Sequence, residues 1–291
     1  MKPAAFEYCR PDSLAEALAL LSEYGDEAAV LAGGLSLGPL LNMRMARPEV
    51  VIDINRLADL ARIERDGEVL RLGALVRQAD VLASAECQDL VPLLVAALGH
   101  VGHYQTRDRG TLAGSAAHAD PSAEVPLCLK TLAGAVELTS ERQVRRVPAD
   151  DFFQGTLTTA RADDEMITAL LWPTDRGRQG FAFEEVSERR GDFAIVAAAA
   201  WAERHDYDEG YRYGLGLGGV EEWSLVSRGG GRRAPEDLAE FADEVIAGVT
   251  EDIEPMRDQR ASAAYRRHLA DHLGRKVLLR ALETALGEVQ S

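Results

Sequence analysis

The spacing of apolar positions near the N-terminus predicts a helix followed by a strand. The leucines within residues 14–21 recur at the interval of one helix face. Ser13 and Glu16 have the spacing of a capping box, and Gly25 is a natural helix stop. The short apolar run at 28–31 then predicts a β-strand.

A glycine turn separates this strand from a second one. The turn at 32–38 (Ala-Gly-Gly-Leu-Ser-Leu-Gly) leads into a brief helical stretch over 39–45, which Pro48 ends. The run Val-Val-Ile-Asp-Ile at 50–54 predicts a strand. Strand, helix and strand together form a compact βαβ-like unit of roughly 55 residues.

Three further elements and one irregular segment follow. Alternating apolar residues over 61–73, with Asp-Gly at 66–67, predict a β-hairpin. Apolar periodicity predicts helices near 76–85 and 91–99. The segment 105–126 is rich in small residues and has no clear period, so we expect a functional loop there.

The rest of the chain contains strands and two longer helices. Strands are predicted at 135–140, 143–148, 165–173, 181–187, 194–201 and 211–220. Helices are predicted at about 235–248 and 261–286, and a loop at 227–235. The Arg- and Gly-rich residues 176–180 mark a domain boundary between these strands.

Composition places the chain among globular proteins with an acidic surface. Hydrophobic residues make up 46% of the 291 residues, and no run of 18 apolar residues could span a membrane. The N-terminal segment lacks an apolar signal core, which argues against export. Asp and Glu (48) outnumber Lys and Arg (32), so the net charge of −16 makes nucleic acid a poor partner. We attribute the acidity to general surface composition.

Three cysteines, Cys9, Cys87 and Cys128, lie far apart in the sequence. This pattern favours reduced thiols in a cytoplasm over a disulfide framework. Three thiols are also too few for an iron–sulfur cluster, which usually needs four. We therefore expect a cytoplasmic protein whose own chain holds no such cluster.

Two motif-like patterns are better explained as ordinary structure. Residues 214–219 match G-x-G-x-x-G, but no amphipathic helix follows, so we expect a glycine-rich strand that another backbone approaches closely. His268 and His272 share a helix face without a third ligand, which favours a solvated face over zinc. His100 and His103 likewise have no cysteine partner nearby.

Ser115, His118 and Asp120 are the residue types of a hydrolase triad. Three residues on one loop rarely reach the geometry of such a triad, however, and no G-x-S-x-G elbow is present. We expect no catalytic residue and no metal ligand on this chain.

Two glycine segments differ from these, because each combines glycine with small or hydroxyl-bearing residues. They are 32–36 (Ala-Gly-Gly-Leu-Ser) and 111–115 (Thr-Leu-Ala-Gly-Ser). Missing Cβ atoms let a ligand approach the backbone, successive N–H groups can form an anion-binding nest, and hydroxyls add donors. Two such segments could hold a pyrophosphate between them. On the residues alone, two ordinary tight turns explain the pattern equally well.

Four segments, in order along the chain, match the signatures of one known family. Residues 32–54 match AGGxSLxPxxxxRxxxPxxxIDI, and 105–126 resemble QIRNRGTIGGNxAHADPAAxxP. Residues 189–201 and 264–282 resemble the C-terminal domain of the same proteins. The chain thus resembles, over 6–286, the FAD-binding (medium) subunits of molybdenum hydroxylases. These include the medium subunits of carbon monoxide dehydrogenase-type enzymes and the flavin domain of xanthine dehydrogenase.

The resemblance implies an α+β fold in two domains. A PCMH-like FAD-binding region over 1–176 would consist of two subdomains, at about 1–55 and 56–176. An α+β C-terminal domain would occupy 177–291, and FAD would lie in the cleft.

The resemblance also implies a set of cofactor-binding residues. Backbone N–H groups and hydroxyls of the two glycine segments would hold the FAD pyrophosphate, with neighbours extending the first segment's contact. These residues are Leu31, Ala32, Gly33, Gly34, Leu35, Ser36, Leu37, Gly38, Thr111, Leu112, Ala113, Gly114 and Ser115. Asp120 would accept hydrogen bonds from sugar or ribityl hydroxyls, Ile167 would pack near the adenine or flavin ring, and Phe193 would lie close to the isoalloxazine.

The chain departs from the family pattern at a few positions. Ala113 stands where relatives often have a second glycine, which requires an ordinary φ angle at that alanine. Glu184 and Glu185 lie in a segment where relatives commonly carry Lys, so the charge near the flavin would be less favourable. Phe193 cannot make the hydrogen bond of a Tyr at that position.

The resemblance implies an electron-transfer subunit of a heteromeric enzyme. A molybdopterin-bearing large subunit would hydroxylate an organic substrate, and [2Fe–2S] clusters of a small subunit would relay single electrons. FAD on this chain would collect two electrons and pass them to an external acceptor, such as a quinone, oxygen, NAD or a protein. Two alternatives stay open: a self-sufficient FAD-dependent oxidoreductase, and a non-enzymatic scaffold that has lost FAD.

Overall fold

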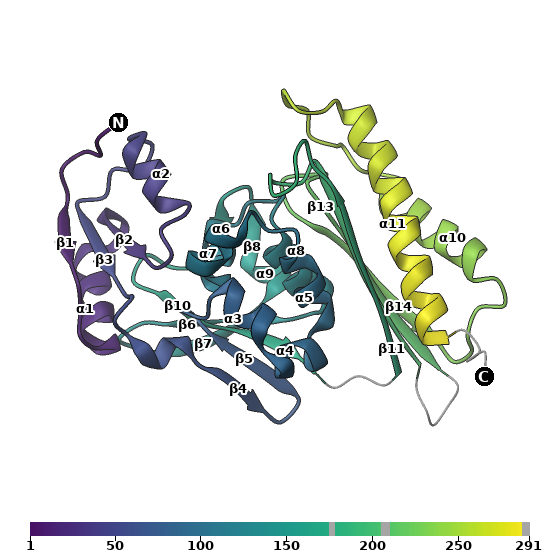
Figure 1. Cartoon of the computed structure of the whole chain (residues 1–291), viewed down its shortest axis with the longest axis horizontal. Helices are drawn as coiled ribbons and strands as arrows, with labels where there is room; N and C mark the ends of the chain where they lie inside the picture. The colour runs from purple at the N-terminus through teal and green to yellow at the C-terminus, as the bar shows by residue number, and fades with distance from the viewer. Residues whose placement is uncertain (175–177, 205–209, 287–291) are drawn as a thin grey trace.

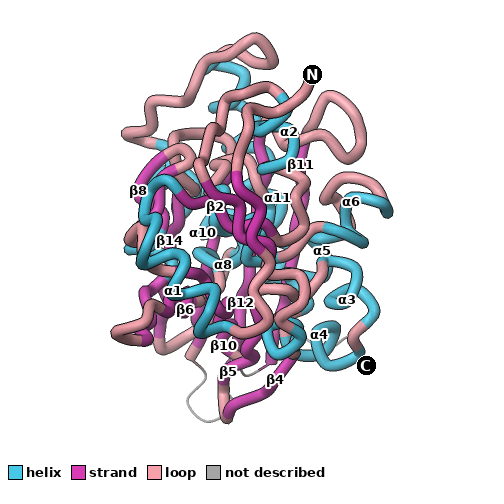
Figure 2. Tube along the Cα trace, turned by 90° about the vertical axis from the view of Figure 1, so that its left-hand side faces the viewer, coloured by secondary structure: helices cyan, strands magenta, loops and turns pink. Residues whose placement is uncertain are grey.

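Three main β-sheets with their helices follow one another along the chain and lie in a row (Figure 1). The structure, a computed structural model, describes residues 1–174, 178–204 and 210–286. We call the three units the first, second and third lobes. Figure 2 looks along the row from the side of the first lobe.

The first lobe is a three-stranded parallel sheet in the order β1-β3-β2 with two helices. Its elements are β1 (Glu7–Cys9), α1 (Leu14–Tyr24), β2 (Ala28–Leu31), α2 (Leu37–Asn42) and β3 (Val50–Asp53). The Ser13 hydroxyl caps α1 by accepting a hydrogen bond from the Glu16 N–H, and Gly25 ends the helix with a φ of 51°. The predicted helix, turn and two strands are confirmed, whereas β1 had no signal in the sequence pattern.

The second lobe is a five-stranded antiparallel sheet in the order β4-β5-β10-β6-β7. Its strands are β4 (Ile63–Asp66), β5 (Val69–Gly73), β6 (Ala135–Thr139), β7 (Val144–Pro148) and β10 (Met166–Pro173). A small hairpin adds β8 (Phe153–Gly155) and β9 (Thr158–Thr159). The helices are α3 (Gln78–Ala83), α4 (Ala85–Leu90), α5 (Pro92–Leu98), α6 (Tyr104–Arg109), α7 (Leu112–His118), α8 (Glu124–Thr131) and α9 (Ala149–Phe152).

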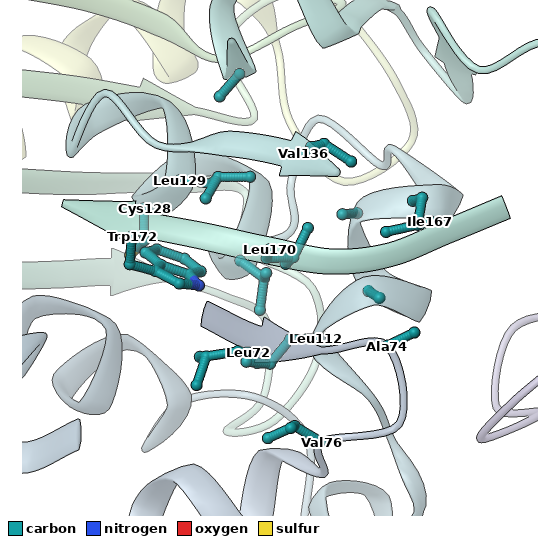
Figure 3. Packing of buried hydrophobic residues seen from close by; sticks show 14 of the residues in the cluster. Leu72, Ala74, Val76, Leu112, Cys128, Leu129, Val136, Ile167, Leu170 and Trp172 are labelled. Atoms are coloured by element: carbon teal, nitrogen blue, oxygen red, sulfur yellow. The ribbon is translucent and has the colours of Figure 1, made fainter. Parts of the chain in front are cut away.

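The core of the second lobe lies between this sheet and its helices. Figure 3 shows Leu72, Leu170 and Val136 from three neighbouring strands packed with Leu112 of α7 and Leu129 of α8. All five side chains are fully buried. Burying an aliphatic side chain of this size contributes about 1.5–3 kcal/mol. The packing therefore holds α7 and α8 against the sheet, and both helices border the site described below.

The third lobe is a four-stranded antiparallel sheet in the order β11-β12-β13-β14. Its elements are β11 (Arg178–Val186), β12 (Val196–Arg204), β13 (Tyr211–Gly218), β14 (Leu225–Gly231), α10 (Leu238–Thr250) and α11 (Ala263–Leu286). In Figure 1, α11 covers the face of this sheet that points away from the second lobe. The opposite face packs on α5 and α8.

This double coverage explains the nearly continuous apolar run in β12. Ala199 and Trp201 belong to the core shared with the second lobe, whereas Ala198 and Ala200 belong to the core beneath α11. A strand buried on both faces has no polar positions to alternate with its apolar ones. The Trp201 indole N–H donates to the Thr131 carbonyl at 2.8 Å, which ties the third lobe to the end of α8.

Two predicted loops are wrong. The segment 105–126 contains most of α6, all of α7 and the start of α8. Helices of six to eight residues are too short to show a clear apolar period, so the pattern concealed them. The predicted loop at 227–235 overlaps β14, whose three glycines pack against Tyr211 and Tyr213 where a Cβ would collide. The helix α4 and the β8–β9 hairpin were not predicted either.

The glycine-rich segment 214–219 forms the second half of β13 and the turn after it, as expected. Only some of the atoms that closely approach its glycines belong to the backbone. The side chains of Trp201 and Thr131 lie against the first two glycines of the motif, Gly214 and Gly216 respectively. A Cβ on Gly219 would lie 2.5 Å from the Ile195 carbonyl oxygen, so backbone crowds the end of the motif. The prediction of close backbone approach therefore holds only there.

The histidine pair and part of the predicted domain boundary lie within the described residues. His268 and His272 are exposed and stack with ring centroids 6.4 Å apart. The described residues contain no cluster of three or more metal-ligating side chains, and no described helix is long and apolar enough to cross a membrane. The predicted boundary at 176–180 lies partly outside the described residues, and β11 begins at Arg178.

Candidate functional site

The two glycine segments line one cleft to which all three lobes contribute. The cleft has a volume of about 410 Å³. The first lobe supplies the turn after β2, and the second lobe supplies Gly110 and the start of α7. Gly191 and Phe193 of the third lobe, from the connection between β11 and β12, complete the wall.

Each glycine of the first segment is required for a different reason. Gly34 has a φ of 76°, a left-handed conformation that side chains with a Cβ rarely adopt. Gly33 instead lies against the Arg109 carbonyl: a Cβ there would collide with the oxygen and come within 3.1 Å of the carbonyl carbon. The first segment therefore touches the backbone that leads into the second.

The second segment has a different local structure, because it begins a helix. Thr111 is the N-cap of α7, and its hydroxyl oxygen accepts a hydrogen bond from the Gly114 N–H at 3.0 Å. Ala113 lies inside the helix and is not among the residues with positive φ. The expectation that Ala113 is tolerated with an ordinary φ is confirmed.

A second cavity, of about 270 Å³, adjoins the first. The two cavities share Ala29, Val30, Ala32, Gly114 and Ala117 in their walls. The second cavity is mainly apolar, and Ile167 lines it next to a β-bulge in β10. Ile167 and Phe193 therefore line different cavities, on the two sides of the glycine segments.

Most of the predicted site residues line these two cavities. The first cavity is lined by Ala32, Gly33, Gly34, Leu35, Ser36, Leu37, Thr111, Gly114, Ser115 and Phe193. The second is lined by Ala32, Ala113, Gly114 and Ile167. Leu31, Gly38, Leu112 and Asp120 line neither.

The four residues outside the cavities have other surroundings. Leu112 is fully buried in the core of the second lobe, and Leu31 packs beneath the turn at Gly34. The Asp120 carboxylate accepts a hydrogen bond from the Ser122 N–H at 2.8 Å in the turn before α8. Their assignment to FAD remains a prediction.

Several lining residues had no signal in the sequence. Gly102 and Gly191 face each other across the second and third lobes, and a Cβ on Gly191 would lie 2.8 Å from the Gly102 carbonyl oxygen. Gln78, at the start of α3, is only 5% exposed, and its side-chain oxygen has no hydrogen-bond partner among the described residues. An unpaired buried acceptor costs about 1–3 kcal/mol.

Glu124 is the second lining residue that sequence reasoning missed. It begins α8 and is 4% exposed. Burial raises the pKa of its carboxyl group to about 8, and the neighbouring carboxylates of Glu185 and Asp120 also raise that pKa, whereas its own backbone N–H and His100 oppose the shift. The wall of the cleft therefore carries a carboxyl group that is neutral at pH 7.

His100, Glu184 and Glu185 each have an ion-pair or hydrogen-bond partner. The His100 Nδ1 lies 3.4 Å from Glu185 Oε1, and this hydrogen bond raises the pKa of His100. Lys276 lies 2.7 Å from Glu184, so a lysine from α11 accompanies that carboxylate. Ser115 and His118 both line the cleft, but no hydrogen bond of the described residues joins either of them to Asp120.

Comparisons with known proteins agree with this architecture. Residues 4–175 match the FAD binding domain in molybdopterin dehydrogenase, and residues 181–281 match the CO dehydrogenase flavoprotein C-terminal domain. The chain is 37% identical to the caffeine dehydrogenase subunit beta of Pseudomonas sp. (strain CBB1), over 91% of this chain and 92% of that one.

Two further relatives are carbon monoxide dehydrogenases. The medium chain of the enzyme from Hydrogenophaga pseudoflava is 33% identical, over 96% of this chain and 97% of the relative. A solved Cu,Mo-CO dehydrogenase structure superposes with a TM-score of 0.88 at 30% identity, over 98% of this chain and 100% of that one. The chain therefore belongs to the medium, FAD-binding subunits of molybdenum hydroxylases of the carbon monoxide dehydrogenase and xanthine dehydrogenase type.

Proposed function

We propose that this chain binds FAD in the cleft and acts as the electron-transfer subunit of a heteromeric molybdenum hydroxylase. When bound, FAD supplies the chemistry, because it can accept electrons singly and release them to an external acceptor. The partners would be a molybdopterin-bearing large subunit and a small subunit with [2Fe–2S] clusters. The relatives named above support such an assembly, since they are single subunits or chains of dehydrogenases, one of them a copper- and molybdenum-containing enzyme.

The observation that carries the proposal is the convergence of the two glycine segments on one cleft. Backbone N–H groups near glycine can approach a diphosphate closely, and the hydroxyls of Ser36, Thr111 and Ser115 add donors at the same wall. In our proposal these groups hold the pyrophosphate of FAD. Asp120, which follows α7 in the chain, accepts hydrogen bonds from sugar or ribityl hydroxyls of FAD.

The two cavities suggest the direction in which FAD lies. The apolar cavity at Ile167 suits the adenine, because it is closed by residues of the first and second lobes and lies away from the third. The cavity at Phe193 suits the isoalloxazine, since Phe193 is 46% exposed and offers an aromatic face.

The proposal includes the domain limits. The FAD-binding region would cover 1–176, with subdomains at about 1–55 and 56–176, and the C-terminal domain would cover 177–291. The first sheet ends at Asp53 and the second begins at Ile63, which supports the division between the subdomains.

FAD content of the purified chain tests the proposal. We expect the wild-type chain to carry FAD, and Gly34→Val and Gly114→Val to lack it, because valine fills the space that the pyrophosphate needs. Gly248→Val is the matched control, since a Cβ at this glycine of α10 meets no atom within 4 Å. FAD content in both cleft variants equal to that of the control would contradict the proposal.

Assembly is tested separately. Co-expression with a molybdopterin-bearing large subunit and a [2Fe–2S] small subunit of the same enzyme should yield a complex that reduces the bound FAD with the organic substrate. We expect the chain alone to leave FAD oxidised under the same conditions. Turnover of a small organic substrate by the chain alone would instead support the self-sufficient oxidoreductase.

A further inference from the structure

A hydrogen-bonded network lies behind the two glycine segments, outside the cleft. Its first part begins at the end of β3. The Asn55 side-chain N–H group donates to the Ala32 carbonyl at 2.8 Å and to the Leu31 carbonyl at 3.4 Å. Asp53 orients Asn55, because its carboxylate accepts from the Asn55 backbone N–H at 2.9 Å and from the side chain at 2.6 Å. Asn55 therefore holds the backbone at the start of the first segment.

Arg77 connects this part of the network to the second segment. Its Nη2 donates to the Asn55 side-chain oxygen at 2.7 Å, and its Nη1 donates to the Arg109 carbonyl at 2.6 Å. The Arg77 backbone also forms an isolated antiparallel bridge with Thr111. A single guanidinium thus links the first lobe to the backbone directly before the second segment.

The first glycine segment is in tight contact with the backbone that leads into the second. Gly33 lies against the Arg109 carbonyl so closely that a Cβ would not fit. The same carbonyl accepts the hydrogen bond from Arg77. Movement of Arg109 away from Gly33 would therefore break the Arg77 contact, and movement of the first segment would strain the Asn55 contact.

We propose that Asn55 and Arg77 form a clamp that sets the separation of the two glycine segments and so keeps the cleft closed on its ligand. This inference rests on the proposed function, because the ligand is the FAD diphosphate. Arg77 lines neither cavity, so it is a positioning residue that acts through the segments.

The geometry explains why the residue is an arginine. Two donors on one planar group reach two acceptors that belong to different lobes. A lysine ammonium on a flexible stem can satisfy one of these acceptors strongly but lacks the planar fork that spans both. Hydrogen bonds from a charged donor are stronger than those between neutral groups, so their loss is large enough to measure.

The rate of FAD dissociation from the full chain tests the clamp. We expect Arg77→Gln to raise this rate by about tenfold or more, since every 1.4 kcal/mol changes a rate or affinity tenfold. Arg77→Lys should restore part of the effect. Arg65→Gln is the matched control, because Arg65 is an exposed arginine whose guanidinium bonds the Gly67 carbonyl in the β4–β5 turn. Its dissociation rate should equal that of the wild type.

A double-mutant cycle separates a clamp from a general loss of stability. In the Asn55→Ala background the link to the first lobe is already cut, so Arg77→Gln should add little to the dissociation rate. Thermal unfolding of the FAD-free variants serves as the structural readout. Dissociation rates that rise additively, or only in proportion to lost thermal stability, would overturn the clamp.

The same measurements distinguish failure of the clamp from failure of the proposed function. A wild-type chain that takes up no FAD would overturn the proposed function. A wild-type chain that binds FAD, together with an Arg77→Gln variant that releases it at the wild-type rate, would overturn the clamp alone.

Discussion

The two glycine segments reach the same cleft with different local structures. The first, after β2, is a turn in which Gly34 needs its left-handed conformation and Gly33 needs its missing side chain. The second begins α7, where Thr111 caps the helix and Ala113 takes the place of a glycine without strain. Glycine is thus a strict requirement in one segment and partly a preference in the other.

This difference indicates how each side of the cleft is held. The first segment depends on contacts outside itself, with Asn55 beneath it and the Arg109 backbone against it. The second is held by its own cap and by the burial of Leu112. Substitutions in the first segment should therefore affect the cleft more than substitutions in the second.

Among substitutions that add or remove a single methyl or hydroxyl group at the cleft, the largest effect is expected from Gly33→Ala. The added Cβ would meet backbone atoms of Arg109 and Gly110, which cannot swing aside as a side chain can, so the two segments must separate. Overpacking of this kind costs about 1–3 kcal/mol, and we expect FAD affinity to fall by about tenfold or more. Titration of the FAD-free chain with FAD measures this.

Gly38→Ala, in α2 directly after the same turn, is the control for that substitution, because Gly38 lines neither cavity. A Cβ at Gly38 meets no atom within 4 Å, and alanine is a better helix former than glycine. Affinity close to the wild-type value is expected. A loss equal to that of Gly33→Ala would show that the first segment tolerates no side chain anywhere, and would remove the special role of the Arg109 contact.

The next expected effect is a pH dependence of stability and FAD affinity, which arises on the side of the cleft that carries the second glycine segment. Glu124, beside the second segment, has a pKa raised from its ordinary value near 4.5 to about 8. The folded chain therefore binds a proton that the unfolded chain releases between these pH values. Its contribution to the free energy of unfolding is complete below about pH 4.5, shrinks as the pH rises and is gone above about pH 8.

Thermal melting from pH 5 to pH 9 checks this expectation. Glu124→Gln should lose less stability than the wild type as the pH rises, because glutamine does not titrate. FAD affinity of the wild type should also fall near pH 8, when the carboxylate becomes anionic next to the diphosphate. Glu184→Gln, at a surface ion pair with Lys276, is the control. Parallel pH profiles for wild type and Glu124→Gln would contradict the assignment.

The sequence pattern was sufficient for most of the strands and for the long helices, whereas the convergence of the glycine segments was implied by the family resemblance and not by the residues alone. An apolar period that continues over several helical turns, as in α11, can be recognised in the sequence whatever the helix packs against. The glycine segments were recognisable because close backbone approach restricts which residues can stand there. The short helices α6 to α8 were missed, since six to eight residues are too few to show a clear apolar period.

Gln78 and Glu124 show what could not be predicted. Each is an ordinary polar residue at the start of a helix, and nothing in its neighbourhood along the chain marks it. Only the packing of the three lobes buries these side chains and turns one into an unpaired acceptor and the other into a neutral acid. Asn55 and Arg77 are similar, because their significance comes from partners that are distant in the sequence.

A smaller effect is expected from Thr111→Val, which removes the cap of α7 while keeping the shape of the side chain. The Gly114 N–H loses its acceptor, and loss of an N-cap costs about 1 kcal/mol. Ser84→Ala removes a comparable cap, from α4, where the hydroxyl accepts from the Cys87 N–H at 3.2 Å. Both variants should lose similar unfolding free energy in urea, but only Thr111→Val should also weaken FAD binding. Equal FAD affinity in the two variants would mean that the cap serves folding alone.

The smallest effect on the cleft is expected from Ala113→Gly, which introduces the glycine that the family resemblance implies at this position. Ala113 is 4% exposed inside α7, and glycine in a helix costs about 0.5–1 kcal/mol relative to alanine. The urea midpoint should therefore fall slightly. FAD affinity should stay within about threefold of wild type, a change of less than 1 kcal/mol, because the alanine methyl borders only the second cavity and no strained backbone is relieved. A marked gain in affinity would mean that the methyl group crowds the ligand, and that the second segment requires glycine as strictly as the first.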